Sequence, residues 1–132
     1  MPLVRISLIK GKSRDHIRAI GEGVHQALIE AFGVPPDDRF QLIQQLDRDD
    51  VIYDAEYLGI HRSDDIVFIN IVAGNWRDTA QKKTLFALIA ANLALNPGLR
   101  PEDVLVVLSP NGRDEWSFGN GLASYVKDDA PA

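Results

Sequence analysis

The sequence predicts an α/β fold, a two-layer sandwich built from two tandem β-α-β units. The same succession of extended, helical and extended apolar patterns occurs over about residues 2–45 and again over about 65–110. The turn that precedes each helix repeats three residues at similar spacing: Gly11, Arg14 and Asp15 correspond to Gly74, Arg77 and Asp78. Because strand–helix–strand crossovers share one hand, we expect both helices to lie on one face of a common sheet.

The first unit contains a strand, a helix and a second extended segment. Residues 3–9 are mostly apolar and predict a strand, and Ser13 is a suitable N-cap for the helix that follows. Over residues 14–32 apolar side chains recur at helical spacing, at Ile17, Ile20, Val24, Leu28 and Ala31. Gly33 predicts the end of this helix, and residues 40–43 resume an extended pattern.

The second unit has the same layout. Residues 66–72 are rich in β-branched side chains and predict a strand, and Asp78 with Gln81 has the spacing of a capping box. The predicted helix carries one apolar face, formed by Leu85, Leu88, Ile89 and Leu93. The Asn-Pro-Gly sequence at residues 96–98 predicts its end, and residues 104–108 predict the last strand.

Two segments lie outside the repeated units. Residues 51–53 are apolar and β-prone, which predicts a short additional strand. The tail over residues 111–132 is rich in glycine and has no periodic pattern, so we expect irregular structure there. The length of 132 residues suits one domain spanning residues 1–132.

Composition limits the classes of function. No apolar run approaches the roughly 20 residues that a membrane-spanning helix needs, and the amino terminus lacks the pattern of a secretory signal. The chain has no cysteine, which excludes disulfides and allows a cytoplasmic location, and its three histidines lack metal-ligand spacing. A net charge of −5 disfavours nucleic acid as the main partner.

Pro2 is the residue with the clearest chemical potential. Removal of Met1, which is common before a small residue or proline, would leave Pro2 as a free secondary amine at the start of the first strand. Such an amine can serve as a general base, a general acid or a nucleophile. The sequence therefore offers a reactive group that depends on processing of the amino terminus.

Together, the proline before the first strand, the duplicated unit and three local segments resemble the tautomerase superfamily, and most of all its malonate semialdehyde decarboxylases. The segments are residues 31–35 (AFGVP), residues 38–41 (DRFQ) and residues 114–121 (DEWSFGNG). The resemblance implies the fold of that superfamily, catalysis by an amino-terminal proline, no cofactor or metal, and assembly as a homotrimer. The implied substrate is a small carboxylate, such as an oxo acid.

The resemblance also implies roles for individual residues. Pro2 and Asp38 match the catalytic proline and aspartate of the decarboxylases, and Arg77 matches the second of two substrate-binding arginines. Asn75 stands where the decarboxylases have the first arginine, so its amide would contact the substrate without neutralising it. Trp116 and Phe118 match residues that wall the pocket, and they complete the expected site.

The charges around Pro2 decide what its amine does. Burial and a nearby Arg77 would lower the pKa of the amine and make it a base, which suits a tautomerase. A nearby Asp38 would raise the pKa and make the amine an acid that polarises a carbonyl. The resemblance implies that the effect of Asp38 dominates and that Pro2 is largely cationic.

Three functions fit these residues. The first is decarboxylation of malonate semialdehyde to acetaldehyde, with Arg77 holding the carboxylate. The second is a keto–enol tautomerase, or a hydratase or dehalogenase of unsaturated 3-haloacids, which the replacement of the first arginine by Asn75 keeps open. The third is a non-catalytic trimeric binding module, which retention of Met1 would favour because a blocked Pro2 nitrogen cannot titrate.

Overall fold

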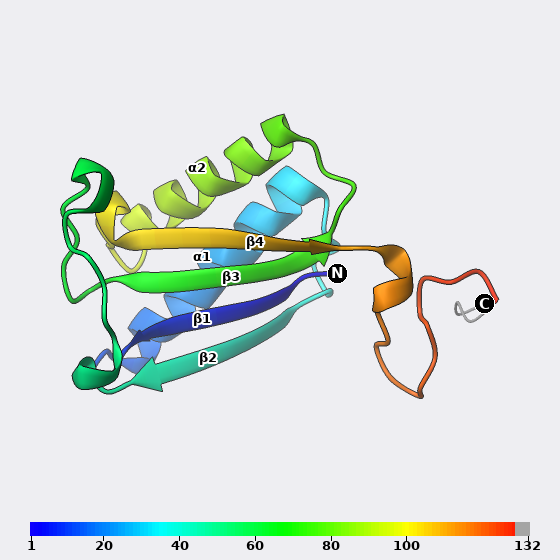
Figure 1. Cartoon of the computed structure of the whole chain (residues 1–132), viewed down its shortest axis with the longest axis horizontal. Helices are drawn as coiled ribbons and strands as arrows, with labels where there is room; N and C mark the ends of the chain where they lie inside the picture. Colours follow the sequence, from blue (N-terminus) through cyan, green and yellow to red (C-terminus); the bar gives the residue numbers. More distant parts are fainter. Residues whose placement is uncertain (129–132) are drawn as a thin grey trace.

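Four strands form one mixed sheet in the computed structural model, which describes residues 1–128 (Figure 1). The strands are β1 (Leu3–Ile9), β2 (Phe40–Leu46), β3 (Val67–Gly74) and β4 (Val104–Asn111). Their order across the sheet is β2-β1-β3-β4. Within each unit the two strands are parallel, and β1 pairs with β3 in the antiparallel sense. The two β-α-β units therefore meet at the centre of the sheet.

Both helices cover the same face of the sheet, as the sequence predicts (Figure 1). Helix α1 (Arg14–Phe32) is capped by the Ser13 side chain and ends at Gly33 in the left-handed conformation that glycine favours. Helix α2 (Thr79–Leu95) begins at the predicted capping box of Asp78 and Gln81. Neither helix, nor any other helix within residues 1–128, is long and apolar enough to cross a bilayer.

The core lies between the helices and the sheet. Alternate strand residues point into it, including Ile6 on β1 and Ile69 on β3, and neither is exposed to solvent. The predicted apolar faces of both helices meet them, with Val24 and Ile89 also fully buried. This packing fixes which strand residues face the helices and which face outward.

Residues 51–53 were expected to form a strand, and this prediction is wrong. A single 3₁₀ turn over Arg48–Asp50 follows β2, and the Arg48 guanidinium donates a hydrogen bond to the Val51 carbonyl. Val51 is buried while Ile52 is 95% exposed, so the segment packs through one side chain without joining the sheet. β-Branched residues form a strand only where they can pair with the edge of a sheet. This turn leads the chain away from the sheet edge, so residues 51–53 have no strand to pair with.

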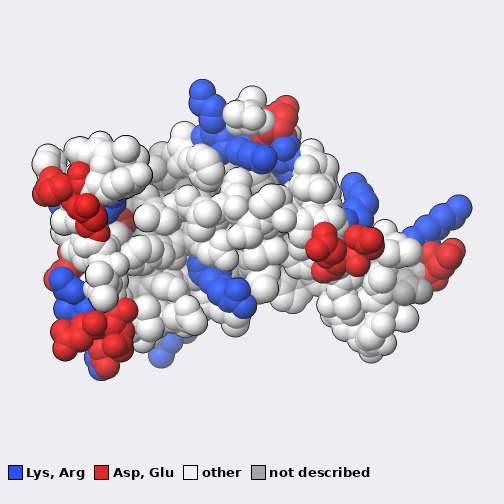
Figure 2. Space-filling model, viewed as in Figure 1, with Lys and Arg blue, Asp and Glu red and all other residues white. Residues whose placement is uncertain are grey.

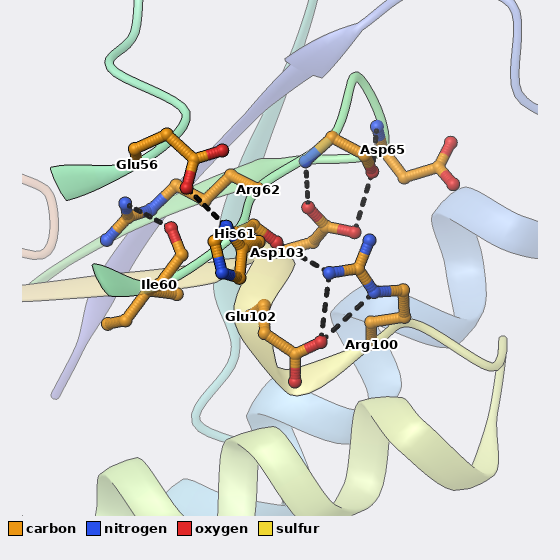
Figure 3. Close-up of polar contacts among 9 residues, drawn as sticks. Glu56, Ile60, His61, Arg62, Asp65, Arg100, Glu102 and Asp103 are labelled. Atoms are coloured by element: carbon orange, nitrogen blue, oxygen red, sulfur yellow. Dashed lines mark hydrogen bonds and ion pairs between the residues drawn. The ribbon is translucent and has the colours of Figure 1, made fainter. Parts of the chain in front are cut away.

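The long connection to β3 is held by a buried carboxylate. Asp103, which is 1% exposed, accepts hydrogen bonds from the backbone N–H of Ser63 at 2.7 Å and from its hydroxyl at 2.8 Å (Figure 3). Beside it, Arg100 donates to the His61 carbonyl and pairs with Glu102. These contacts fasten the 54–65 segment to the start of β4.

Asp103→Ala is expected to lower the free energy of unfolding by about 2–3 kcal/mol, because a charged acceptor of two hydrogen bonds is removed from a buried position. Urea denaturation followed by circular dichroism measures this change. The control is Asp49→Ala, which removes an exposed carboxylate and should change the free energy by less than about 0.5 kcal/mol. Equal losses in the two variants would contradict the anchoring role of Asp103.

The face of the sheet opposite the helices is largely uncharged and open. In Figure 2 the area over the strands is mostly white apart from a basic side chain near its middle, and most charged side chains lie around its edges. Large apolar side chains on the two outer strands are exposed there, including Phe40 and Leu42 on β2 and Leu105 and Val107 on β4. An exposed apolar area of this kind is typical of a protein interface.

Candidate active site

The amino terminus meets Asp38 at one end of the sheet. Because β1 and β3 are antiparallel, the start of β1 lies beside the end of β3 and the beginning of the tail (Figure 1). The amine of Met1 forms an ion pair with Asp38 Oδ2, and both groups are mostly shielded from solvent. Pro2 is buried, and its nitrogen lies in the peptide bond to Met1. The fold thus places an amino-terminal nitrogen next to the aspartate that the sequence predicts.

The pKa of this amine reflects opposing influences. Burial lowers the pKa of the Met1 amine below 8.0, and this effect outweighs the hydrogen bond and charge of Asp38, which raise it. Arg77 lowers the pKa further through its charge, so that side chain also lies within electrostatic reach. The resemblance implied that Asp38 would dominate. For the amine of Met1, burial has the stronger effect.

Arg77 lies between the two units. Its Nη2 donates a hydrogen bond of 3.2 Å to the Phe32 carbonyl at the end of α1, and its guanidinium lies 4.7 Å from the centre of the Phe32 ring. Its Nη1 is buried and has no hydrogen-bond partner within residues 1–128. Burial lowers the pKa of Arg77, with Tyr125 and Asp38 opposing and Arg113 reinforcing the effect. A partly buried guanidinium with a free donor is suited to binding an anion.

Trp76 organises the two arginines. The Arg77 and Arg113 guanidinium carbons lie 4.8 Å and 4.3 Å from the centre of its ring. The ring packs on Gly74, where any Cβ would overlap it. Cation–π contacts of this type hold guanidinium groups in place, so Trp76 positions Arg77 near the amino terminus.

Gly74→Ala is expected to displace the Trp76 ring and to lower catalytic efficiency about tenfold, through loss of the cation–π contacts that position Arg77. Near-ultraviolet circular dichroism reports the ring environment, and steady-state kinetics report the efficiency. The control is Gly112→Ala, where the nearest neighbour of a new Cβ is the movable end of the Glu115 side chain at 3.2 Å. An unchanged near-ultraviolet spectrum in Gly74→Ala would show that the ring does not depend on this close approach.

Aromatic residues wall the other side of the amino terminus. Pro2 lines a pocket of about 360 Å³ together with Phe40, Trp116 and Phe118. The Trp116 and Phe118 rings are stacked, with centres 5.2 Å apart and planes 2° from parallel, and Phe40 lies 5.6 Å from Phe118. Trp116 Nε1 donates to Asn111 Oδ1 at 2.8 Å, which ties the tail to the end of β4. The geometry therefore brings Trp116 and Phe118 to Pro2, from the opposite end of the sequence.

Tyr125 is a site residue that the sequence did not predict. Its ring contacts Phe118 edge to face, with centres 5.5 Å apart. Burial and the charge of Asp38 raise the pKa of Tyr125, whereas Arg113 and Arg77 lower it. The phenol therefore lies within electrostatic reach of both Asp38 and Arg77. Its segment has no periodic pattern, so the sequence held no signal for its position.

The remaining predicted residue, Asn75, is separate from these groups. It is exposed and lines neither the pocket at Pro2 nor the smaller cavity at Arg77, although its backbone N–H donates to the Asn111 carbonyl at 2.8 Å. Arg113 and Lys82 also lie close to Arg77, and neither was predicted from the sequence to belong to the site. Within residues 1–128, no cluster of three His, Asp or Glu side chains could hold a metal ion.

Comparison with known proteins identifies the family of the chain. Two family models, each described as tautomerase enzyme, match residues 2–61 and 38–119. The chain is also 38% identical over 127 residues to the probable tautomerase YusQ of Bacillus subtilis (strain 168), covering 96% of this chain and 100% of that protein. It belongs to the tautomerase family. A second probable tautomerase of the same organism, YrdN, is 29% identical over 96% of this chain and 97% of that protein.

Solved structures share the fold of this tautomerase-family enzyme over nearly its whole length. Malonate semialdehyde decarboxylase, known in wild-type, mutant and inactivated forms, is 30% identical with a TM-score of 0.90, covering 98% of this chain and 99% of that one. FG41 malonate semialdehyde decarboxylase inhibited by 3-bromopropiolate is 36% identical with a TM-score of 0.90, covering 98% of each chain. A fused 4-OT symmetric trimer shares the fold at 20% identity, with a TM-score of 0.77 over 93% and 97% of the two chains.

Proposed function

We propose that this enzyme decarboxylates malonate semialdehyde to acetaldehyde without a cofactor, using the amine of Pro2 after removal of Met1. The observation that carries the proposal is the meeting of the amino terminus, Asp38 and Arg77 at one end of the sheet, beside the aromatic wall. The two decarboxylase structures with TM-scores of 0.90 support it. Trp116 and Phe118 would limit the access of water to the reacting atoms.

The proposed step separates the carboxylate from the carbonyl. Arg77 holds the substrate carboxylate, and Pro2, in its cationic form, donates a hydrogen bond to the aldehyde oxygen. Breaking the C–C bond releases CO₂ and leaves its electron pair on the aldehyde fragment as an enolate. The Pro2 ammonium stabilises the oxygen of that enolate, and protonation at carbon gives acetaldehyde. A Pro2 iminium would accept the same electron pair.

Asp38 keeps the amine cationic in this scheme. Its carboxylate raises the pKa of the amino-terminal amine against the effect of burial. Removal of Met1 also replaces a primary amine by the secondary amine of proline, which is ordinarily more basic. Asp38 would thus act through Pro2, whereas Asn75 has no part in this scheme.

A second candidate function is a keto–enol tautomerase, or a hydratase or dehalogenase of unsaturated 3-haloacids. The observation in its favour is the lowered pKa of the Met1 amine, where burial is the largest influence. A neutral amine would take a proton from carbon as a general base. Incubation with malonate semialdehyde separates the two functions, because only the decarboxylase releases acetaldehyde.

The open face of the sheet supports assembly as a homotrimer. Phe40, Leu42 and Val107 are each 50% exposed there, and a similar fold assembles as a trimer in fused 4-OT. Native mass spectrometry should therefore find three copies, and Leu42→Glu should release monomers because it places a charge in the apolar interface. A monomeric wild-type protein at micromolar concentration would contradict the assembly.

A further inference from the structure

A small cationic cavity lies beside Arg77, at the end of α1 and the ends of β3 and β4. Its volume is about 190 Å³, and Phe32, Leu108 and Pro110 supply apolar walls. Two basic residues, Arg77 and Lys82, line it, and none of its lining residues is acidic. Two basic side chains and no acidic one along a partly apolar cavity make it suited to binding an anion.

The hydrogen bonding of Arg77 also indicates that the cavity binds an anion. Its Nη2 donates a hydrogen bond to the Phe32 carbonyl, whereas its buried Nη1 has no acceptor within residues 1–128. A charged N–H group buried without an acceptor is costly, so an acceptor from a ligand is expected at this position. A carboxylate would provide it.

Lys82 is placed unusually for a helix cation. It lies in the opening turns of α2, where the helix dipole disfavours positive charge, and the N-terminus there is already capped by Asp78 and Gln81. Within residues 1–128 its ammonium forms no ion pair. Adjacent lysines at residues 82 and 83 would ordinarily mark a solvated helix face, but Lys82 is half-buried and lines the cavity, whereas Lys83 is exposed.

We propose that Lys82 binds the substrate carboxylate together with Arg77, as the second cation of the site. The proposal rests on the proposed function, in which the substrate is a three-carbon oxo acid. Arg77 is common to both regions, because it lines the cavity and lies within electrostatic reach of the amino terminus and Asp38. Asn75 is uncharged and lines neither cavity, and Arg113 lies on the Trp76 ring and does not line the cavity either. Lys82 does line it, so the second charge comes from the helix.

Binding of a non-reacting acid tests this role independently of turnover. The probe is 3-hydroxypropanoate, which has the length and carboxylate of malonate semialdehyde but no aldehyde, and 1,3-propanediol is the uncharged control ligand. The Kd is measured by NMR titration of ¹⁵N-labelled protein whose mass shows that Met1 is absent. We expect Lys82→Met to raise the Kd at least tenfold, Lys82→Arg to stay within threefold of wild type, and Lys83→Met to leave it unchanged.

The kinetics provide a second readout. Lys82→Met should raise the KM for malonate semialdehyde at least tenfold and change kcat much less, because binding that is common to the ground state and the transition state is lost. If Lys82→Met has the same Kd and KM as Lys83→Met, the role of Lys82 is overturned and the decarboxylase proposal stands. Absence of 3-hydroxypropanoate binding to the wild type would also overturn the role of Lys82. Lys82-dependent binding without acetaldehyde formation would uphold the carboxylate site and reject the decarboxylase activity.

Discussion

Arg77→Ala is expected to lower kcat/KM for malonate semialdehyde by about a thousandfold or more, because the proposed mechanism loses its main donor to the substrate carboxylate. Arg77 contributes little to folding stability, so a loss of activity in this variant can be separated from a loss of folded protein. Within residues 1–128 it makes one hydrogen bond, to the Phe32 carbonyl, which accounts for about 1 kcal/mol of folding free energy, and cation–π contacts with Phe32 and Trp76 that add about as much. The far-ultraviolet circular dichroism spectrum should therefore match the wild type, and the Tm should fall by only a few degrees.

The conservative variant shows what Arg77 contributes. Arg77→Lys keeps the charge but loses the planar pair of donors, so it should recover part of the lost efficiency. The matched control is Arg14→Ala, which removes the arginine at the corresponding place in the first unit, on an exposed part of α1. Turnover of Arg77→Ala within a few-fold of wild type would remove Arg77 from the mechanism.

Asp38→Asn is expected to move the pH dependence of the reaction to lower pH. Asp38 raises the pKa of the Met1 amine, and the proposed mechanism assigns it the same effect on the Pro2 amine, so its removal should lower that pKa. The cationic amine exists below its pKa, so the proposed decarboxylation would be lost as pH rises through that value. In Asp38→Asn the falling limb of kcat/KM should begin at lower pH, with at least about a tenfold loss at pH 8.

The pH profile also separates the two candidate functions. If the amine acts as a base, as in a tautomerase, activity appears as pH rises through the pKa, and Asp38→Asn extends activity toward lower pH. Asp37→Asn is the control, because Asp37 is the exposed neighbour of Asp38. A profile in Asp38→Asn identical to that of Asp37→Asn would show that Asp38 does not set the protonation of Pro2.

Local sequence signals predict the scaffold well, because each depends on neighbouring residues. The Ser13 cap, the left-handed Gly33 and the Asp78–Gln81 capping box all form as expected. Helical spacing likewise identifies the buried faces of both helices. The strand predicted at residues 51–53 does not form, because the turn at Arg48 determines the path of the chain there and local β propensity does not.

The candidate site is harder to predict, because its parts meet only in three dimensions. Pro2 and Trp116 line one pocket although nothing periodic connects them, and the family resemblance is what linked them. Tyr125 reaches Phe118 through an irregular tail that offers no local pattern. Lys82 and Lys83 are adjacent and chemically identical, so only the direction of the helix face distinguishes the cavity residue from the exposed one.

The central claim is that the amine of Pro2 carries out decarboxylation. A proton NMR time course with malonate semialdehyde tests it most directly, on protein whose mass shows that Met1 is absent and on Pro2→Ala in parallel. We predict acetaldehyde formation by the wild type and its loss in the variant. No acetaldehyde above the level of Pro2→Ala would contradict the claim and would leave Pro2 as a base for tautomerase or hydratase chemistry.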